Sequence, residues 1–191
     1  SQNDIPKKLL ENEKILRDKA SGFVGDLPVI VGDIISFPVF QIHSLRHGIK
    51  VVEFQTPHYE RLILMFAQKV LTQNHWDTEN AISKMELETY QPPKLDCIHN
   101  TEYLNVERFT DFPQFIFDRI RLDPKNTYEN HLSGRYQLLI IISGIAKVVS
   151  KSGKSLKLKK KESLFLPVTM EYYRIESIGD NQLICLNATP K

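Results

Sequence analysis

The chain of 191 residues is poor in cysteine, with only Cys97 and Cys185. Their spacing fits no metal-binding or redox motif, and so few thiols are typical of a reduced, cytosolic protein, so we predict a cytoplasmic localisation. Long apolar runs are also missing, because no stretch approaches the roughly 20 residues that a membrane-spanning helix needs. The N-terminus is polar and rich in lysine, which does not fit a signal peptide. The sequence therefore predicts no membrane partner.

An excess of charge of one sign is absent as well. The chain has 25 basic and 23 acidic residues, a formal net charge of +2. This balance gives no global field that would recruit nucleic acid, so we predict no nucleic-acid partner. The basic run "KSGKSLKLKKKE" alternates locally with Leu156 and Leu158, which favours the solvent face of a strand over an anion-binding patch. The apolar content of 41% is enough for a real core and argues against general disorder.

Two helices are predicted. The first belongs to an N-terminal helical segment, residues 1–25, with Asp4 as a cap, Pro6 in its first turn and Gly22 at its end. The second lies in "WDTENAISKMELETY", with Asp77 or Thr78 as its cap. Its inward face is predicted to contain Ala81, Ile82, Met85 and Leu87. Two prolines, at 92 and 93, end this segment and mark the best candidate for a linker.

Short β-strands are predicted for most of the remaining chain. Residues 27–38 and 48–57 are β-rich runs punctuated by Gly and Pro, and "RLILMFAQKVL" fits either a strand or a helix. From Leu95 onwards, strands are predicted for "LNVERF", "QFIFDRIRL", "QLLIIISGIAKVVS", "KSLKLKK", "ESLFLP", "EYYRIES" and "QLICLNA". Regular short strands with few helices favour an antiparallel sandwich or small barrel.

The chain contains a weak internal repeat. "GDIISFPVFQIH" ends at His43, and "KESLFLPVTMEY" ends at Tyr172 with the same spacing around a proline. In both segments, the residues just before the proline, "DIISF" and "ESLFL", are mainly apolar. The repeat suggests two copies of one barrel unit, in which only the first copy keeps a metal-type residue.

These motifs resemble a known family. The pattern G-x5-P-x4-H looks like the second motif of the cupins, small antiparallel β-barrels that often hold a metal at their mouth. More specifically, "VIVGDIISFPVFQIHSLRHGIKVVEFQTPHYERLIL" resembles the region of type I phosphomannose isomerases in which a strand, "P-A-G-T-x-H" and a later "E-I-Q…Y-R" follow one another. The segments "YQLLIIISGIAKVV", "LKKKESLFLPV" and "LICLNATP" are similar to the C-terminal barrel of that family.

The resemblance implies an activity and its residues. It implies that His43 is one of four zinc ligands and that Arg61, two residues after Tyr59, is a catalytic residue. Zinc would be the cofactor and a phosphorylated hexose the substrate, in the interconversion of mannose 6-phosphate and fructose 6-phosphate. From the residues alone, His43 also fits a turn histidine, and Arg61 fits a surface arginine paired with Glu53 or Glu60.

The remaining zinc ligands of that family have no counterpart before Gly32. The resemblance therefore implies the C-terminal portion of a longer enzyme, which needs a missing N-terminal portion or a second subunit and is inactive alone. The alternative is a non-catalytic cupin module that binds a sugar or a partner chain.

The expected organisation is an N-terminal helical segment (1–25), a partial first cupin barrel with a connecting helix (26–93) and a degenerate C-terminal cupin barrel (94–191). In the last, the positions of the cupin motifs hold His131, Ser133, Gln137 and Tyr172, which is not a metal set. A structural core of Leu138 to Ile142 with Phe165 is predicted there.

Overall fold

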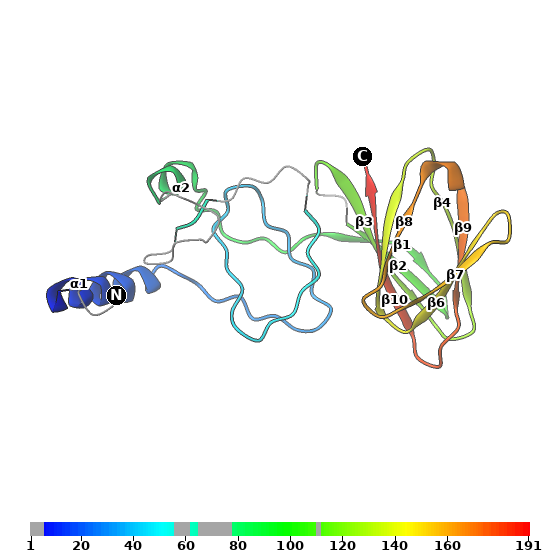
Figure 1. Cartoon of the computed structure of the whole chain (residues 1–191), viewed down its shortest axis with the longest axis horizontal. Helices are drawn as coiled ribbons and strands as arrows, with labels where there is room; N and C mark the ends of the chain where they lie inside the picture. The colour runs from blue at the N-terminus through cyan, green and yellow to red at the C-terminus, as the bar shows by residue number, and fades with distance from the viewer. Residues whose placement is uncertain (1–5, 56–61, 65–77, 110–111) are drawn as a thin grey trace. The chain divides into compact units, whose positions relative to one another are not determined.

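A computed structural model describes residues 6–55, 62–64, 78–109 and 112–191. The chain divides into two compact units, residues 1–92 and 93–191. They are called the N-terminal unit and the jelly roll below, and each is described by itself (Figure 1).

The N-terminal unit contains two helices among its described residues, α1 (Lys7–Ser21) and α2 (Thr78–Lys84). Helix α1 starts after Pro6, whose fixed φ suits a helix start, and ends before Gly22, as predicted. Helix α2 is shorter than predicted, so Leu87 lies beyond its end and is 78% exposed. Among the described residues of this unit, Ala81 is the one buried side chain.

The strands predicted at 27–38 and 48–57 are wrong for the described part of this region, which forms no strand. Its backbone hydrogen bonds are local turns instead, as between Asp33 N–H and the Ile30 carbonyl at 3.2 Å. A single bridge pairs Gln41 with Glu86. A β-rich run becomes a strand only when a neighbouring strand takes up its backbone groups. The partial first barrel stays a prediction.

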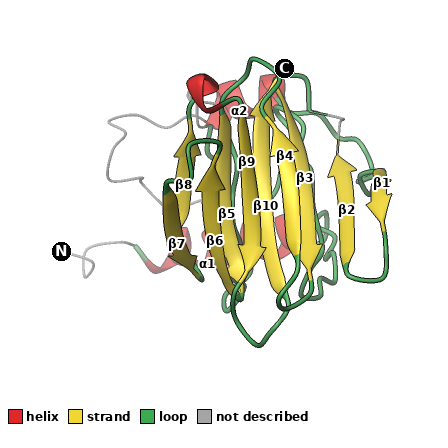
Figure 2. Cartoon of the chain, turned by 90° about the vertical axis from the view of Figure 1, so that its right-hand side faces the viewer, coloured by secondary structure: helices red, strands yellow, loops and turns green. Residues whose placement is uncertain are grey.

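The jelly roll contains ten antiparallel strands within its described residues. They are β1 (Leu95–Asn100), β2 (Leu104–Phe109), β3 (Phe115–Leu122), β4 (Thr127–His131), β5 (Gln137–Ser143), β6 (Ile145–Ser150), β7 (Ser155–Lys159), β8 (Ser163–Leu166), β9 (Tyr172–Ser177) and β10 (Leu183–Pro190). Six form one sheet in the order β1-β2-β3-β10-β5-β8, and four form the other in the order β4-β9-β6-β7 (Figure 2).

This order is that of a jelly roll. The chain passes repeatedly between four strands of the larger sheet, β3-β10-β5-β8, and the four strands of the smaller sheet, β4-β9-β6-β7. The β1–β2 hairpin extends the larger sheet. The predicted mainly β, antiparallel jelly-roll fold is therefore confirmed. The two sheets share one core, with Val106, Ile120 and Leu139 from one and Val148 and Ile175 from the other.

The inward faces follow the two-residue period of a strand, and this corrects the predicted core. Leu139 and Leu166 are fully buried. Leu138 and Phe165, which were expected in the core, lie opposite each other on the outer face and are 43% and 55% exposed. Every second residue of an apolar run faces outward, so the run cannot be buried as a block when one face of its sheet is solvated.

The run "QLLIIISGIAKVVS" crosses from one sheet to the other at Gly144. Its φ is +79°, and an added Cβ would lie 2.9 Å from the Cα of Leu183. Glycine is required there for both reasons. No helix in the part of the chain that the structure describes is both long and apolar enough to cross a membrane.

Candidate functional site

The two residues that the resemblance singles out lie in the N-terminal unit. His43 is exposed, and its ring stacks on Phe37 with 4.0 Å between the centroids. Its Nδ1 lies 2.9 Å from the Gln41 carbonyl oxygen. Because a carbonyl only accepts, Nδ1 carries a proton, and the tautomer with this proton has its lone pair on Nε2. A carbonyl orients metal-binding histidines in the same way. Arg61 lies outside the described residues.

In the jelly roll, the four residues that the resemblance placed at motif positions are His131, Ser133, Gln137 and Tyr172. Of the four, only Gln137 is buried in the interior. His131 and Tyr172 are cross-strand partners on the outer face, and the Tyr172 hydroxyl donates to Glu129 at 2.7 Å. His131 and Ser133 line an open hollow on the surface. The equivalence of Tyr172 and His43 stays a prediction, because the described residues around His43 form no strand to superpose.

The residues that do face the interior form a closed, neutral network. Asn130 Nδ2 donates to Gln137 Oε1 at 3.2 Å and to the Tyr173 hydroxyl at 2.8 Å, and this hydroxyl donates to Gln137 Oε1 at 2.8 Å. Burial raises the pKa of Tyr173 well above its ordinary value, so the phenol stays protonated. The prediction missed Asn130 and Tyr173 because it followed motif spacing. For Tyr173, the alternation within "EYYRIES" was the available signal.

A row of polar residues crosses the inner face of the larger sheet. Arg108, Asp118, Asn187 and Leu139 are successive cross-strand partners on β2, β3, β10 and β5. Arg108 donates two hydrogen bonds to Asp118, from Nε to Oδ1 at 2.7 Å and from Nη2 to Oδ2 at 2.8 Å.

Asn187 is the unusual member of this row. It is 0% exposed, and neither side-chain amide atom has a hydrogen-bonding partner among the described residues. A buried polar group left unpaired costs about 1–3 kcal/mol, so each such group needs an explanation.

The zinc that the resemblance implies does not fit these residues. Zinc in proteins takes thiolate, imidazole or carboxylate ligands, usually three or four of them. The interior of the jelly roll offers neutral amides, a protonated phenol, a carboxylate that already holds Arg108 and one buried thiol, Cys185, whose pKa burial raises to about 12. Across the described residues, no three His, Cys, Asp or Glu side chains gather to hold a metal ion. His43 supplies a single ligand.

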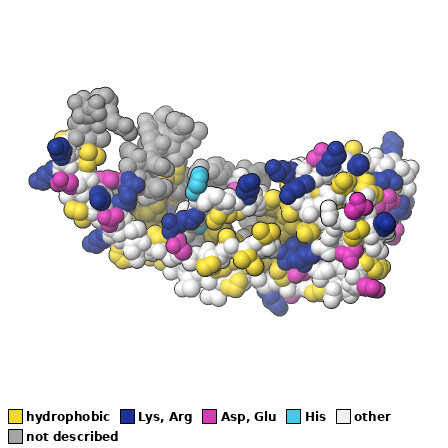
Figure 3. Space-filling model, turned by 90° about the horizontal axis from the view of Figure 1, so that it is seen from below, with side chains coloured by type: hydrophobic (Ala, Val, Ile, Leu, Met, Phe, Trp, Pro, Cys, Tyr) yellow, Lys and Arg dark blue, Asp and Glu magenta, His cyan; other side chains and the backbone are white. Residues whose placement is uncertain are grey.

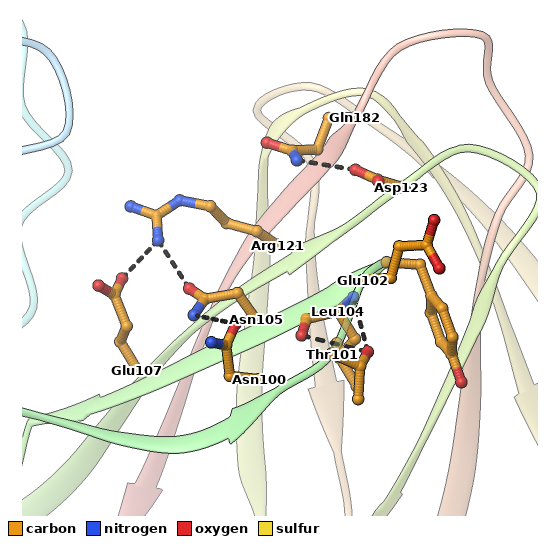
Figure 4. Close-up of a pocket in the computed structure, with 10 residues that line it drawn as sticks. Asn100, Thr101, Glu102, Leu104, Asn105, Glu107, Arg121, Asp123 and Gln182 are labelled. Atoms are coloured by element: carbon orange, nitrogen blue, oxygen red, sulfur yellow. Dashed lines mark hydrogen bonds and ion pairs between the residues drawn. The ribbon is translucent and has the colours of Figure 1, made fainter.

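A groove of about 340 Å³ lies on the jelly roll where the β1–β2 turn meets β3 (Figure 4). Its lining is mainly polar. It is formed by Asn100, Thr101, Glu102, Tyr103, Leu104, Asn105, Glu107, Arg121, Asp123 and Gln182. These residues come from three separate parts of the chain, so no local sequence motif predicts the groove. We call this feature the groove.

Side chains of the groove hold one another in place. Arg121 Nη1 donates to Asn105 Oδ1 at 2.8 Å and to Glu107 Oε2 at 2.6 Å, as the dashed lines of Figure 4 show. Gln182 Nε2 donates to Asp123 Oδ1 at 2.9 Å. The groove therefore presents polar groups that are already ordered.

The charge of Glu107 follows from its two arginine partners. Burial acts to raise the pKa of Glu107, but the hydrogen bonds and charges of Arg119 and Arg121 outweigh it, and the pKa is lowered. Glu107 is therefore ionised at neutral pH. Glu102 and Asp123 also line the groove, so its lining has three carboxylates, and the two guanidinium groups nearby both pair with Glu107.

The basic run behaves as the solvent face of a strand. Its central part, Ser155–Lys159, forms β7 at the edge of the smaller sheet, where Lys157 is opposite Lys147 and Leu158 is buried. Lysines on an edge strand discourage pairing with other chains. Figure 3 shows basic and acidic side chains interspersed over the visible face of the jelly roll rather than one basic field.

Comparisons with known proteins give only a partial likeness to solved structures. No protein-family model matches the chain. No curated protein matches it. Among solved structures, oxalate decarboxylase from Lactobacillus farciminis is 20% identical, with 51% of this chain and 30% of that chain covered and a TM-score of 0.43.

Two further similar structures are described as cupin domains. The cupin domain of Schizosaccharomyces pombe Cnp3 is 16% identical, with 49% of this chain and 65% of that chain covered and a TM-score of 0.42. The cupin domain of an XRE family transcriptional regulator from Enterobacter cloacae is 14% identical, with 46% and 96% covered and a TM-score of 0.39. The chain thus spans less than two thirds of the first two proteins it is similar to. The fold assignment rests on the strand order of the jelly roll.

Proposed function

We propose that the jelly roll is a non-catalytic carbohydrate-binding module and that the groove binds an uncharged hexose. The observation that carries this proposal is the ordered polar lining of the groove, with Arg121 fixed between Asn105 and Glu107. Side chains that are ordered before binding lose little freedom when a ligand arrives.

The chemistry of the lining suits sugar hydroxyls. Each hydroxyl both donates and accepts a hydrogen bond, and the amides of Asn100, Asn105 and Gln182 do the same. The carboxylates accept from further hydroxyls. Tyr103 is 45% exposed and offers an apolar ring face to the C–H groups of a sugar. The volume of about 340 Å³ lies within the usual range for small-molecule sites, roughly 300–1,000 Å³.

The charge of the groove favours an uncharged sugar over a phosphorylated hexose. Three carboxylates stand against two guanidinium groups, and Glu107 occupies both arginines. A phosphate placed here would meet a surplus of negative charge, and like charges repel. Uncharged hydroxyls avoid this repulsion.

Calorimetric titration of the full chain with mannose and with mannose 6-phosphate tests the proposal. We expect mannose to bind and its phosphate to bind at least tenfold more weakly. Asn105→Ala should weaken mannose binding at least tenfold, because it removes a lining amide and the acceptor that holds Arg121. Glu171→Gln, at a carboxylate outside the groove, is the control and should change nothing. Binding of neither sugar, or full affinity in the Asn105 variant, would refute the proposal.

A second candidate function is the mannose-6-phosphate isomerase activity, which we propose for an assembly in which further residues complete the site. The orientation of His43 by the Gln41 carbonyl favours it, since the lone pair on Nε2 suits a zinc ligand. In this proposal Arg61 would be the catalytic arginine and a phosphorylated hexose the substrate.

Zinc content after dialysis and turnover of mannose 6-phosphate test the second candidate. We expect neither zinc nor turnover in the 191-residue chain, and both when the missing ligands are supplied by a longer form or a second subunit. Zinc that is lost in a His43→Ala variant of the active form would support the assignment. An active form that keeps its zinc in that variant would rule out His43.

A further inference from the structure

We infer that the groove prefers a hexose that carries an amino group, such as mannosamine, over the corresponding neutral sugar. The inference rests on the proposed function, because it names the class of carbohydrate that the same groove selects. It follows from the distribution of charge along the groove, whose lining residues lie partly on strands and partly on turns.

The positive charge of the groove lies at its strand end. Arg121 on β3 donates to Asn105 and Glu107 on the neighbouring strand β2, at 2.8 and 2.6 Å. Arg119 donates to the same Glu107 carboxylate at 2.7 Å. A further cation placed beside these two guanidinium groups would be repelled. This end of the groove therefore suits hydroxyl groups, which the amide of Asn105 can bind.

The turn end of the groove contains negative charge. Glu102 lies in the turn between β1 and β2, and Asp123 follows the last residue of β3, both away from Glu107 (Figure 4). The Asp123 N–H donates to the Tyr103 carbonyl at 2.9 Å, which holds the turn beside Asp123. Within the described part of the chain, neither carboxylate forms an ion pair. Asp123 Oδ1 accepts from Gln182 at 2.9 Å, and its Oδ2 has no donor among the described residues.

An ammonium group matches this turn end. It has one positive charge and three N–H donors, and its hydrogen bonds to carboxylates are stronger than those of a neutral hydroxyl. An amino sugar has its ammonium and its hydroxyls on adjacent carbons of one ring. Its charge can therefore lie at Glu102 and Asp123 while its hydroxyls lie along the amides at the strand end.

Calorimetric titration of the full chain with mannosamine, mannose and propylamine tests the inference, at about pH 6, where the amines are protonated. We expect mannosamine to bind at least fivefold more tightly than mannose. It should bind at least tenfold more tightly than propylamine, which has the charge without the ring. Raising the salt concentration from about 0.01 M to about 0.1 M shortens the Debye length from roughly 30 to roughly 10 Å, so it should weaken mannosamine binding more than mannose binding.

A charge-removing variant provides the second measurement. The double variant Glu102→Gln and Asp123→Asn keeps an acceptor oxygen at each position, including the one that Gln182 needs. We expect the preference for mannosamine over mannose to fall below twofold in this variant. Glu171→Gln, at a carboxylate outside the groove, is the control and should keep the full preference.

The outcomes separate the inference from the proposed function. Equal affinities for mannosamine and mannose in the wild type would overturn the inference and leave carbohydrate binding intact, whereas binding of neither sugar would refute both. Propylamine that binds as tightly as mannosamine would overturn the inference, because the groove would then select charge alone. A preference that persists in the double variant would also overturn it.

Discussion

The ion pair between Arg108 and Asp118 gives an asymmetric prediction. The Asp118 side chain is 5% exposed and the Arg108 side chain is 36% exposed, although the two share a pair of hydrogen bonds of 2.7 and 2.8 Å. Replacing Arg108 leaves the Asp118 carboxylate buried in the core without its partner. Removing the carboxylate leaves an arginine whose long stem can carry its charge to water. The arginine variant should therefore be the less stable of the two.

The magnitudes follow from the burial of each partner. Arg108→Met should destabilise the jelly roll by about 3–5 kcal/mol, the usual result of leaving one buried charge unpaired. Asp118→Leu should destabilise it by about 1.5–3 kcal/mol, the contribution of hydrogen bonds to a charged group. The double variant should lie close to the wild type, because apolar side chains of similar volume often replace a buried ion pair without loss.

Urea unfolding followed by tyrosine near-ultraviolet circular dichroism measures all three variants. The signal reports on the jelly roll because Tyr128 and Tyr173 pack in or against its core. For a unit of about 100 residues, 1 kcal/mol corresponds to roughly 4–8 °C in Tm, so thermal melts provide an independent check. Equal losses in the two single variants, or a double variant that loses as much stability as both single variants together, would refute the reasoning.

Three further predictions concern single positions. Gly144→Ala should destabilise the jelly roll by at least about 1–2 kcal/mol in urea unfolding, because its φ is positive and the new Cβ would meet Leu183; an unchanged midpoint would contradict this. Cys97 is exposed, whereas full burial raises the pKa of Cys185 to about 12, so a thiol reagent at pH 8 should label Cys97 in the folded chain and Cys185 only in urea. Because the pKa of Glu107 is lowered in the folded state, its contribution to stability should be present above about pH 4.5, its unfolded value, and fade as the pH falls through the folded value. Glu107→Gln should therefore flatten this part of the stability curve, and an unaltered curve would argue against the assignment.

The strands of the jelly roll were largely predictable because their alternation is strong. The run "LNVERF" coincides with β2, since Leu104 and Val106 face the core and Asn105 and Glu107 alternate with them. Strand β4 was missed, because "TYENH" is mainly polar and contributes Tyr128 and Asn130 to the inner side. Its pairing with β9 supplies the order that its own composition does not.

The candidate sites were predictable only in part. Motif spacing identified Gln137 but missed the neighbouring interior residues by one position, with His131 in place of Asn130 and Tyr172 in place of Tyr173. A shift of one residue in a strand exchanges its two faces, so a small error in spacing reverses the chemistry of the site. The groove could not be predicted, because Asn105, Arg121 and Gln182 meet only through strand pairing and turns.

The measurement that most directly tests carbohydrate binding by the jelly roll is a ¹H–¹⁵N spectrum of the full chain titrated with mannose. Saturable shifts are expected at the backbone and side-chain amides of residues 100–107, 121–123 and 182, and not along β7 on the other sheet. A spectrum without saturable shifts, or with shifts confined to residues outside the groove, would contradict the proposed function.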